Sequence, residues 1–147
     1  MSGAPDVDYT ATSARPPWSA LPASLRTALA VALGTEILEA GPSVGSGFTG
    51  GFAAPVKLAD GREVFVKAAD DSQHPYTAYQ REAELVPRLP NSIRVPRIIA
   101  TAHATDGEAR WFAVASERVE ARMPGMPWTP EDFATVTATC EQMAVAL

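Results

Sequence analysis

Apolar residues recur along the chain at two spacings, one typical of helices and one typical of strands. Helical spacing predicts three helices, which cover residues 22–33, 77–89 and 129–147. Gly34 is a typical stop for the first helix, and Pro87 should kink or end the second helix early. Both boundary residues therefore agree with the apolar pattern.

The third helix carries the strongest of these patterns. Thr129 is a good N-cap residue, and Pro130 suits the first helical position. The apolar stripe that follows alternates spacings of three and four and consists of Phe133, Val136, Cys140, Met143 and Leu147. The chain stops at Leu147 without a glycine or a polar tail. We therefore expect this helix to pack on a part of a protein that is not in this sequence.

Short apolar runs between glycine, proline and polar residues predict five strands. The first opens at Ile37-Leu38, and the others cover residues 52–58, 63–68, 97–103 and 111–119. Asp60-Gly61 is a strong hairpin signal after the second strand, and residues 105–108 form a turn between the last two strands. Such short connections favour a mainly antiparallel sheet, with one helix inserted after the third strand. The predicted fold class is therefore α+β.

Composition divides the chain into four parts. Residues 1–17 are rich in Ser, Ala, Pro and Asp and read as a mobile leader. Residues 18–120 hold the predicted sheet and its helices. Residues 121–128 contain prolines and a glycine and form a connector, and residues 129–147 form the last helix. We therefore expect one folded domain, followed by the start of a second unit.

The overall composition is that of a folded domain. The chain has 147 residues, of which 46% are hydrophobic and 20% charged, which argues against global disorder. Its formal net charge of −5 gives no general attraction to nucleic acids or anionic membranes. Cys140 is alone, so an intrachain disulfide is impossible, and neither a membrane span nor a secretory signal is visible. A cytoplasmic protein is therefore expected.

Four glycines within seven residues mark the first candidate binding element. The run Gly45-Ser46-Gly47-Phe48-Thr49-Gly50 fits the pattern G-x-G-x-x-G, in which backbone N–H groups can approach a phosphate. A dinucleotide-binding loop of this pattern leads into a helix. Here a run with Pro55 and the Asp60-Gly61 hairpin follow, so the loop joins two strands. We predict that it cradles nucleotide phosphates; the alternative is an ordinary surface turn.

Pro55 also constrains the sheet. Proline has no backbone N–H, so it should lie at an edge or at a bulge.

Lys67 is the second candidate, because it ends an apolar strand and needs an anionic partner there. Alternation along the strand places Phe65 and Lys67 on one face. The ammonium would contact phosphates, and Phe65 would line a base pocket. Glu82 lies close to the apolar stripe of the next helix and is the preferred partner, with Glu84 as the competing choice. The alternative for Lys67 is a surface lysine at a strand end.

The end of the last strand is the third candidate. Backbone groups from Glu117 to Val119, where the strand meets the connector, are placed to read an adenine edge; the alternative is a plain strand exit. His74 and His103 have no partner ligands at metal-binding spacing, so no metal site is predicted in this chain.

In this order the motifs resemble the N-terminal lobe of a protein-kinase-like fold, specifically the aminoglycoside phosphotransferase family of small-molecule kinases. Residues 45–52 are similar to the kinase loop G-x-G-x-x-G-x-V, with Phe52 in the place of the valine. Residues 64–67 (VFVK) resemble V-A-I-K, and residues 81–85 (REAEL) resemble the helix that carries the glutamate partner of the lysine. The resemblance covers residues 37–119. It implies ATP and Mg²⁺ as cofactors and a hydroxylated small molecule as acceptor.

One part of the family pattern is missing from this sequence. The family's catalytic loop has a His-Gly-Asp-like sequence that supplies the base, and a later Asp holds magnesium. Neither His74 nor His103 is followed by Gly-Asp or by an Asp two positions on. We therefore expect an ATP-binding lobe, with residues 121–128 as the hinge and residues 129–147 as the start of a truncated second lobe. On its own this fragment should be catalytically inactive, because it has neither the base nor the magnesium ligands.

The alternative is a self-standing α+β module that binds a nucleotide or a partner protein without catalysis. The acceptor pocket of the family lies mainly in the second lobe, so the sequence does not identify the acceptor.

Overall fold

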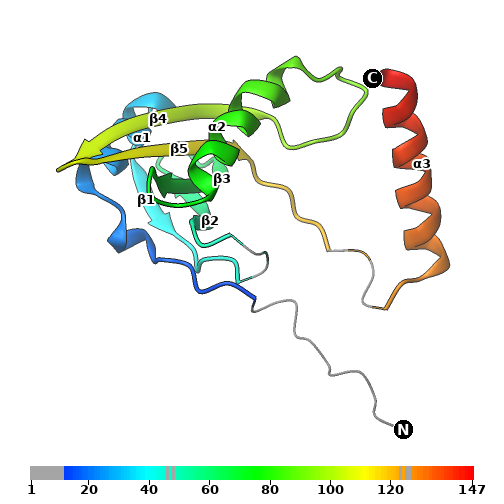
Figure 1. Ribbon diagram of the computed structural model, residues 1–147, viewed down its shortest axis with the longest axis horizontal. Coiled ribbons are helices and arrows are strands. Elements are labelled where there is room, and N and C mark those ends of the chain that lie inside the picture. Colours follow the sequence, from blue (N-terminus) through cyan, green and yellow to red (C-terminus); the bar gives the residue numbers. More distant parts are fainter. Residues whose placement is uncertain (1–11, 46, 48, 123, 125–126) are drawn as a thin grey trace, which may run out of the picture.

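The computed structural model describes residues 12–45, 47, 49–122, 124 and 127–147. In these residues three α-helices accompany a five-stranded sheet (Figure 1). The helices are α1 (Ala23–Leu33), α2 (Pro75–Leu85) and α3 (Pro130–Ala146), and short 3₁₀ turns cover Trp18–Ala20 and Val86–Arg88. The strands are β1 (Ile37–Ala40), β2 (Phe52–Leu58), β3 (Glu63–Asp70), β4 (Ile98–Asp106) and β5 (Ala109–Glu117). The α+β class predicted from the sequence is confirmed.

The sheet is antiparallel throughout, and β3 is its central strand. The strand order is β1-β2-β3-β5-β4, and each neighbouring pair is antiparallel. Helix α2 is inserted between β3 and β4, as predicted, and ends at Leu85, just before Pro87. A proline lacks the N–H that would continue the helix, so the chain tightens into a 3₁₀ turn there.

Both hairpins form where the sequence predicts them, but the second is tighter than expected. Gly61 in the first turn has a φ of 89°, which glycine adopts without strain. In the second hairpin β4 and β5 pair as far as Asp106 and Ala109. Only Gly107 and Glu108 remain between them, not the whole of residues 105–108. Gly107 has a φ of 60° and so permits this tight turn.

Pro55 lies in β2, just past the end of β1. The last β1–β2 pair is Ala40 with Val56, and the carbonyl of Pro55 accepts a hydrogen bond from Gly41 N at 2.8 Å. A strand residue directs its N–H and C=O to the same side. The missing N–H of Pro55 therefore faces the loop beyond β1, where no ladder needs it. The predicted edge or bulge position is therefore not found, because β2 lies between β1 and β3; the proline is tolerated because the ladder with β1 has ended at Val56.

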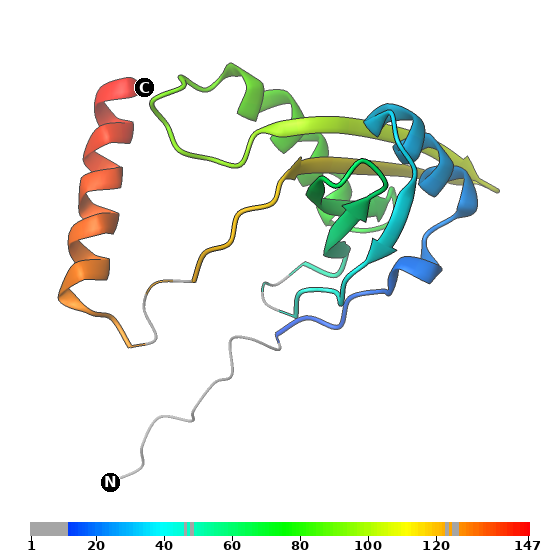
Figure 2. The same ribbon diagram turned by 180° about the vertical axis from the view of Figure 1, so that it is seen from behind.

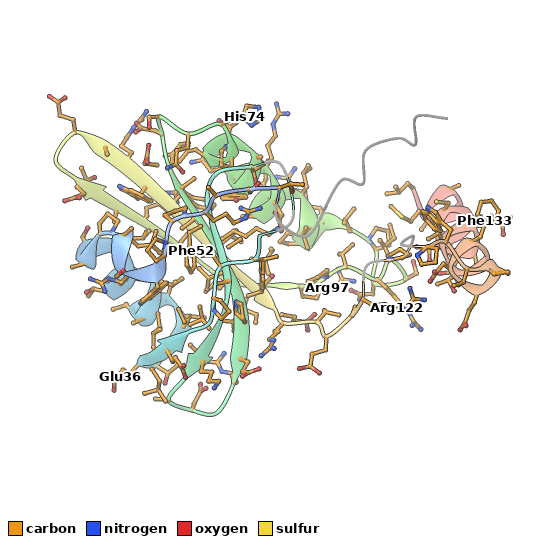
Figure 3. All side chains as sticks on the ribbon, turned by 90° about the horizontal axis from the view of Figure 1, so that it is seen from below. Glu36, Phe52, His74, Arg97, Arg122 and Phe133 are labelled. Atoms are coloured by element: carbon orange, nitrogen blue, oxygen red, sulfur yellow. The ribbon has the colours of Figure 1, made fainter. Side chains whose placement is uncertain are left out.

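One face of the sheet packs against α1. Leu25, Leu29 and Leu33 are buried there, whereas Ala32 is exposed. The helix ends at Gly34, whose φ of 73° gives the predicted stop. The sheet side of this core consists mainly of Phe52, Ala54, Val56 and Leu58 from β2 and Val64, Val66 and Ala68 from β3 (Phe52 is labelled in Figure 3).

The opposite face carries a smaller core under α2. Tyr79 of α2 packs with Ala69, Phe112 and Val114 of the sheet. Because side chains alternate along β3, Phe65 and Lys67, which lie between the core residues Val64, Val66 and Ala68, point to this second face.

Helix α3 stands apart from the sheet (Figures 1 and 2). Its N-terminus is capped as predicted: Asp132 N donates to Thr129 Oγ1 at 3.1 Å, and Thr129 N donates to Asp132 Oδ2 at 3.2 Å. The predicted apolar stripe faces solvent here, with Phe133 69% and Leu147 77% exposed (Phe133 is labelled in Figure 3). Within the described ranges, no helix combines the length and the apolar character that crossing a bilayer requires.

The cap of α3 should depend on pH. A hydrogen bond from Arg122 holds the pKa of Asp132 below its ordinary value. The contribution of this carboxylate is therefore complete above the unfolded-state pKa of about 3.9 and is lost as the pH falls through the lower folded-state value. We expect the first turn of α3 to fray over that acidic range, measured by NMR amide shifts of residues 131–135.

Asp132→Asn is the matched control, because asparagine also caps helices but does not titrate. If the first-turn amides of this variant and of the wild type show the same acid transition, Asp132 is not its cause.

Candidate functional site

The site centres on an ion pair between β3 and α2. Lys67 Nζ donates to both carboxylate oxygens of Glu82, each at 2.7 Å. Each side chain keeps 30% of its surface exposed. The ammonium also lies 5.9 Å from the ring centre of Tyr79, within the range of a cation–π contact. The lysine is thus fixed in direction while one side of it remains open to a ligand.

Glu82, not Glu84, is the partner of Lys67, as the sequence pattern favoured. Glu84 instead pairs with Arg88 at 2.9 Å on the exposed side of α2, four residues further along the helix. The difference follows from helix geometry, because Ala83 faces the sheet and Glu82 lies at the edge of that buried stripe.

The register of β2 and β3 brings Lys67 close to the glycine loop. Lys67 pairs with Ala53, which lies only two residues after Gly51 at the exit of the loop. On the other side Lys67 pairs with Val114 of β5. Lysine, loop exit and carboxylate are therefore neighbours in space, although 29 positions separate Ala53 from Glu82 in the sequence (82 − 53).

Two residues on the face of Lys67 were not found by sequence reasoning. Val114 is 1% exposed and Ser116 is 6% exposed, and they pair with Lys67 and Phe65 respectively. Together with half-buried Phe65 they make up this face of the sheet beside Lys67. The only sequence signal for them was the alternation of β5, and that pattern does not reveal which strand β5 pairs with.

The glycine loop is held by residues that the sequence assigned to a mobile leader. Ser13 N donates to the carbonyl of Gly45 at 3.0 Å, and Arg15 Nη1 donates to the carbonyl of Gly51 at 2.7 Å. In Figure 2 this segment, drawn in blue, runs beside the loop between β1 and β2. The leader predicted over residues 1–17 is therefore wrong from Thr12 onward, because hydrogen bonds tie this part to the domain.

The glycines of the loop differ in how strictly they are required. Gly47 has a φ of 102°, a conformation that residues with a side chain rarely adopt. Gly50 has open space around the position of a Cβ. At Gly51 a Cβ would lie 2.8 Å from the carbonyl oxygen of Ala68 and 3.0 Å from Tyr79 Oη. Gly51, which the sequence analysis left out of the site, is thus a close approach of backbone to β3 and α2.

The other loop candidates are only partly placed. Gly45 and Thr49 are half-buried, and the carbonyl of Gly45 accepts the hydrogen bond from Ser13 N. Ser46 and Phe48 lie outside the described residues, so their predicted phosphate contacts stay predictions.

One backbone group of Glu117 is engaged within the sheet. Its backbone N–H donates to the carbonyl of Arg97 at 2.9 Å, and its carboxylate accepts from Arg97 N at 3.0 Å. The N–H is therefore engaged at the edge with β4 and is not available to read an adenine edge. Val119 lies beyond the end of β5 and is 59% exposed, so its backbone role stays a prediction.

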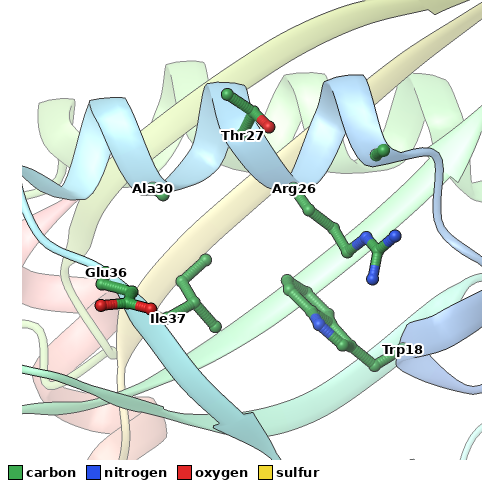
Figure 4. A pocket seen from close by; sticks show the side chains of 7 residues that line it. Trp18, Arg26, Thr27, Ala30, Glu36 and Ile37 are labelled. Carbon is green, nitrogen blue, oxygen red and sulfur yellow. The ribbon is translucent and has the colours of Figure 1, made fainter.

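Four cavities lined by described residues lie away from the Lys67–Glu82 pair. One of about 310 Å³ lies between α1 and β1, beside Trp18, Arg26 and Glu36 (Figure 4). Trp18 packs on the core beneath α1, so this cavity is on the opposite side of the sheet from Lys67. Another, of about 330 Å³, is lined in part by Glu117 and Val119.

Metal ligands do not gather in the described ranges: no three His, Cys, Asp or Glu side chains there are placed to hold an ion. The magnesium implied by the family resemblance therefore has no ligand set among these residues.

Comparisons with known proteins neither support nor refute the resemblance. No protein-family model matches the chain, and no curated protein is significantly similar to it. The resemblance therefore depends on the motifs and their order.

Gly51 and Gly50 give a matched pair of substitutions. Gly51→Ala should lower the free energy of unfolding by about 1–3 kcal/mol, because the new methyl group would overpack against the backbone of β3. Gly50→Ala should change it little, because nothing lies within 4 Å of the added carbon. Denaturant unfolding of both variants measures the difference. Equal stabilities would contradict the close approach at Gly51.

Proposed function

We propose that this chain binds ATP between the glycine loop and the face of the sheet that carries Lys67. The observation that carries the proposal is the Lys67–Glu82 ion pair, with both N–O distances at 2.7 Å, next to the exit of the loop. A lysine acts on phosphates as a point charge, and a carboxylate partner fixes its direction. A glycine-rich loop beside it adds backbone N–H groups as further donors.

A purely structural role explains the ion pair less well. Ion pairs that remain open to water add little to stability, because side-chain entropy and screening offset the Coulomb energy. Lys67 and Glu82 are each 30% exposed, so joining β3 to α2 is a weak reason for them to be there. Tyr79 and Ala83 already join α2 to the sheet through apolar contacts.

The residues have separate roles in the proposed site. Lys67 neutralises phosphate charge, Glu82 orients Lys67, and half-buried Phe65 lines the base. In the aminoglycoside phosphotransferase family, which the motifs resemble, bound ATP supplies the phosphoryl group that is transferred to a hydroxyl. We propose that this chain contributes the ATP-binding lobe of such an aminoglycoside or small-molecule phosphotransferase. The transfer step additionally needs a base and magnesium ligands, which the matched motifs do not include.

The two lysines of the chain allow a controlled test. Lys67→Ala should weaken ATP binding by roughly tenfold or more, because a hydrogen bond to a charged group is worth about 1.5–3 kcal/mol. Lys57→Ala is the control: Lys57 is 60% exposed and pairs with Glu39 of the edge strand β1. Calorimetric or NMR titration with ATP measures both. Equal affinities of the two variants would remove Lys67 from the site.

The carboxylates provide a second arm of the same test. Glu82→Gln should weaken ATP binding several-fold, because Lys67 loses the partner that orients it, whereas Glu84→Gln should not. If both changes have the same effect, general charge and not orientation is responsible.

A non-catalytic interaction module is the second candidate function. The exposed apolar side chains of α3 favour it, with Phe133 69% and Val145 90% exposed. A wild-type protein that does not bind ATP at millimolar concentration would exclude the first proposal and leave this one.

A further inference from the structure

Residues 12–16, here called the strap, supply side-chain and backbone donors to the glycine loop from outside the kinase-like motifs. Thr12 Oγ1 donates to the carbonyl of Gly47 at 2.7 Å, and Ser13 Oγ donates to the same oxygen. A carbonyl oxygen has two lone pairs, so both are occupied here. Ser13 N also donates a hydrogen bond to the carbonyl of Gly45.

Arg15 connects the strap to the far end of the loop, at Gly51. Its Nη1 donates to the carbonyl of Gly51 at 2.7 Å, across the mouth of the loop. Its Nη2 lies 3.0 Å from the place where a Cβ on Gly47 would be. The guanidinium thus packs directly on the backbone of Gly47 and spans to Gly51. The guanidinium can lie this close because Gly47 has no side chain.

The loop also holds the strap in return. Ser43 Oγ, on the side of the loop next to β1, donates to the carbonyl of Pro16 at 2.9 Å. The strap and the loop are therefore joined at both ends and not only at one contact.

In these contacts the strap donates hydrogen bonds to carbonyl groups of the loop. A loop that binds phosphate must turn its N–H groups toward the phosphate and its carbonyls away, because carbonyl and phosphate oxygens repel each other. Hydrogen bonds from the strap hold the carbonyls of Gly45, Gly47 and Gly51 on the side away from the proposed phosphate position. Glycines have the greatest backbone freedom, so without such contacts these peptides would reorient easily.

We propose that the strap is part of the nucleotide site, and that Arg15 is the positioning residue that holds the glycine loop in its phosphate-binding form. This rests on the proposed ATP binding and adds a residue and a segment to it. The strap acts through the loop, so it affects the phosphate end of the ligand and not the base.

The test compares ATP with adenosine, which has the base but no phosphates. Arg15→Ala should weaken ATP binding roughly three- to tenfold, the loss expected for one or two hydrogen bonds, and leave adenosine binding unchanged. NMR titration reads both affinities, including weak ones. Arg15→Lys should recover part of the ATP affinity, because an ammonium can still donate to Gly51. Arg94→Ala, at an exposed arginine outside the loop, is the control.

A milder pair keeps the test valid if Arg15→Ala does not fold. Thr12→Val removes the hydroxyl that binds Gly47 at nearly constant shape, and Thr12→Ser keeps it. Thr12→Val should weaken ATP binding in the same selective way, and Thr12→Ser should match the wild type.

The outcomes separate the two proposals. If wild type binds ATP but the strap variants bind it equally well, or lose ATP and adenosine together, the role of the strap is overturned and ATP binding stands. If wild type does not bind ATP, the proposed function fails and the strap has nothing to position.

Discussion

The alternation of side chains along β3 is the constraint on which the rest of the structure depends. Val64, Val66 and Ala68 are buried under α1, and Lys67 between them reaches Glu82 on α2. A slip of one residue in register would exchange the two faces. It would place an ammonium in the apolar core and expose the valines, at a cost that no surface interaction offsets. The hairpin at Asp60-Gly61 sets this register.

From this strand the candidate site is assembled out of distant segments. β3 supplies Lys67, α2 supplies Glu82, and the loop before β2 supplies its glycines. The strap then fastens the loop from a part of the chain 35 residues earlier. Each segment contributes one kind of group: a cation, a carboxylate, backbone amides or donors for carbonyls. None of them makes a binding site alone, because charge neutralisation and orientation of a phosphate need several groups at fixed positions.

Gly51 and Arg15 show how closely stability and binding are linked in this region. Gly51 brings the start of β2 against Ala68 and Tyr79, which packs α2 onto the sheet. Arg15 binds the carbonyl of the same residue from the other side. The end of the loop at Gly51 is therefore held from two sides. Within the loop, Gly47 has a backbone conformation that only glycine adopts readily.

The sequence by itself determined the types of the elements, their turns and the pairing of Lys67 with Glu82. These are local signals: period 2 or 3.6, Asp60-Gly61, Gly34, Pro87, and a carboxylate at the edge of a helical stripe. Only the tertiary structure decided the order of the strands, the place of Ser116 beside Phe65, the use of the Glu117 N–H by Arg97, and the strap. The reason is physical. Periodicity and turns are set by neighbouring residues, whereas a hydrogen bond from Thr12 to Gly47 joins segments whose local sequences carry no trace of each other.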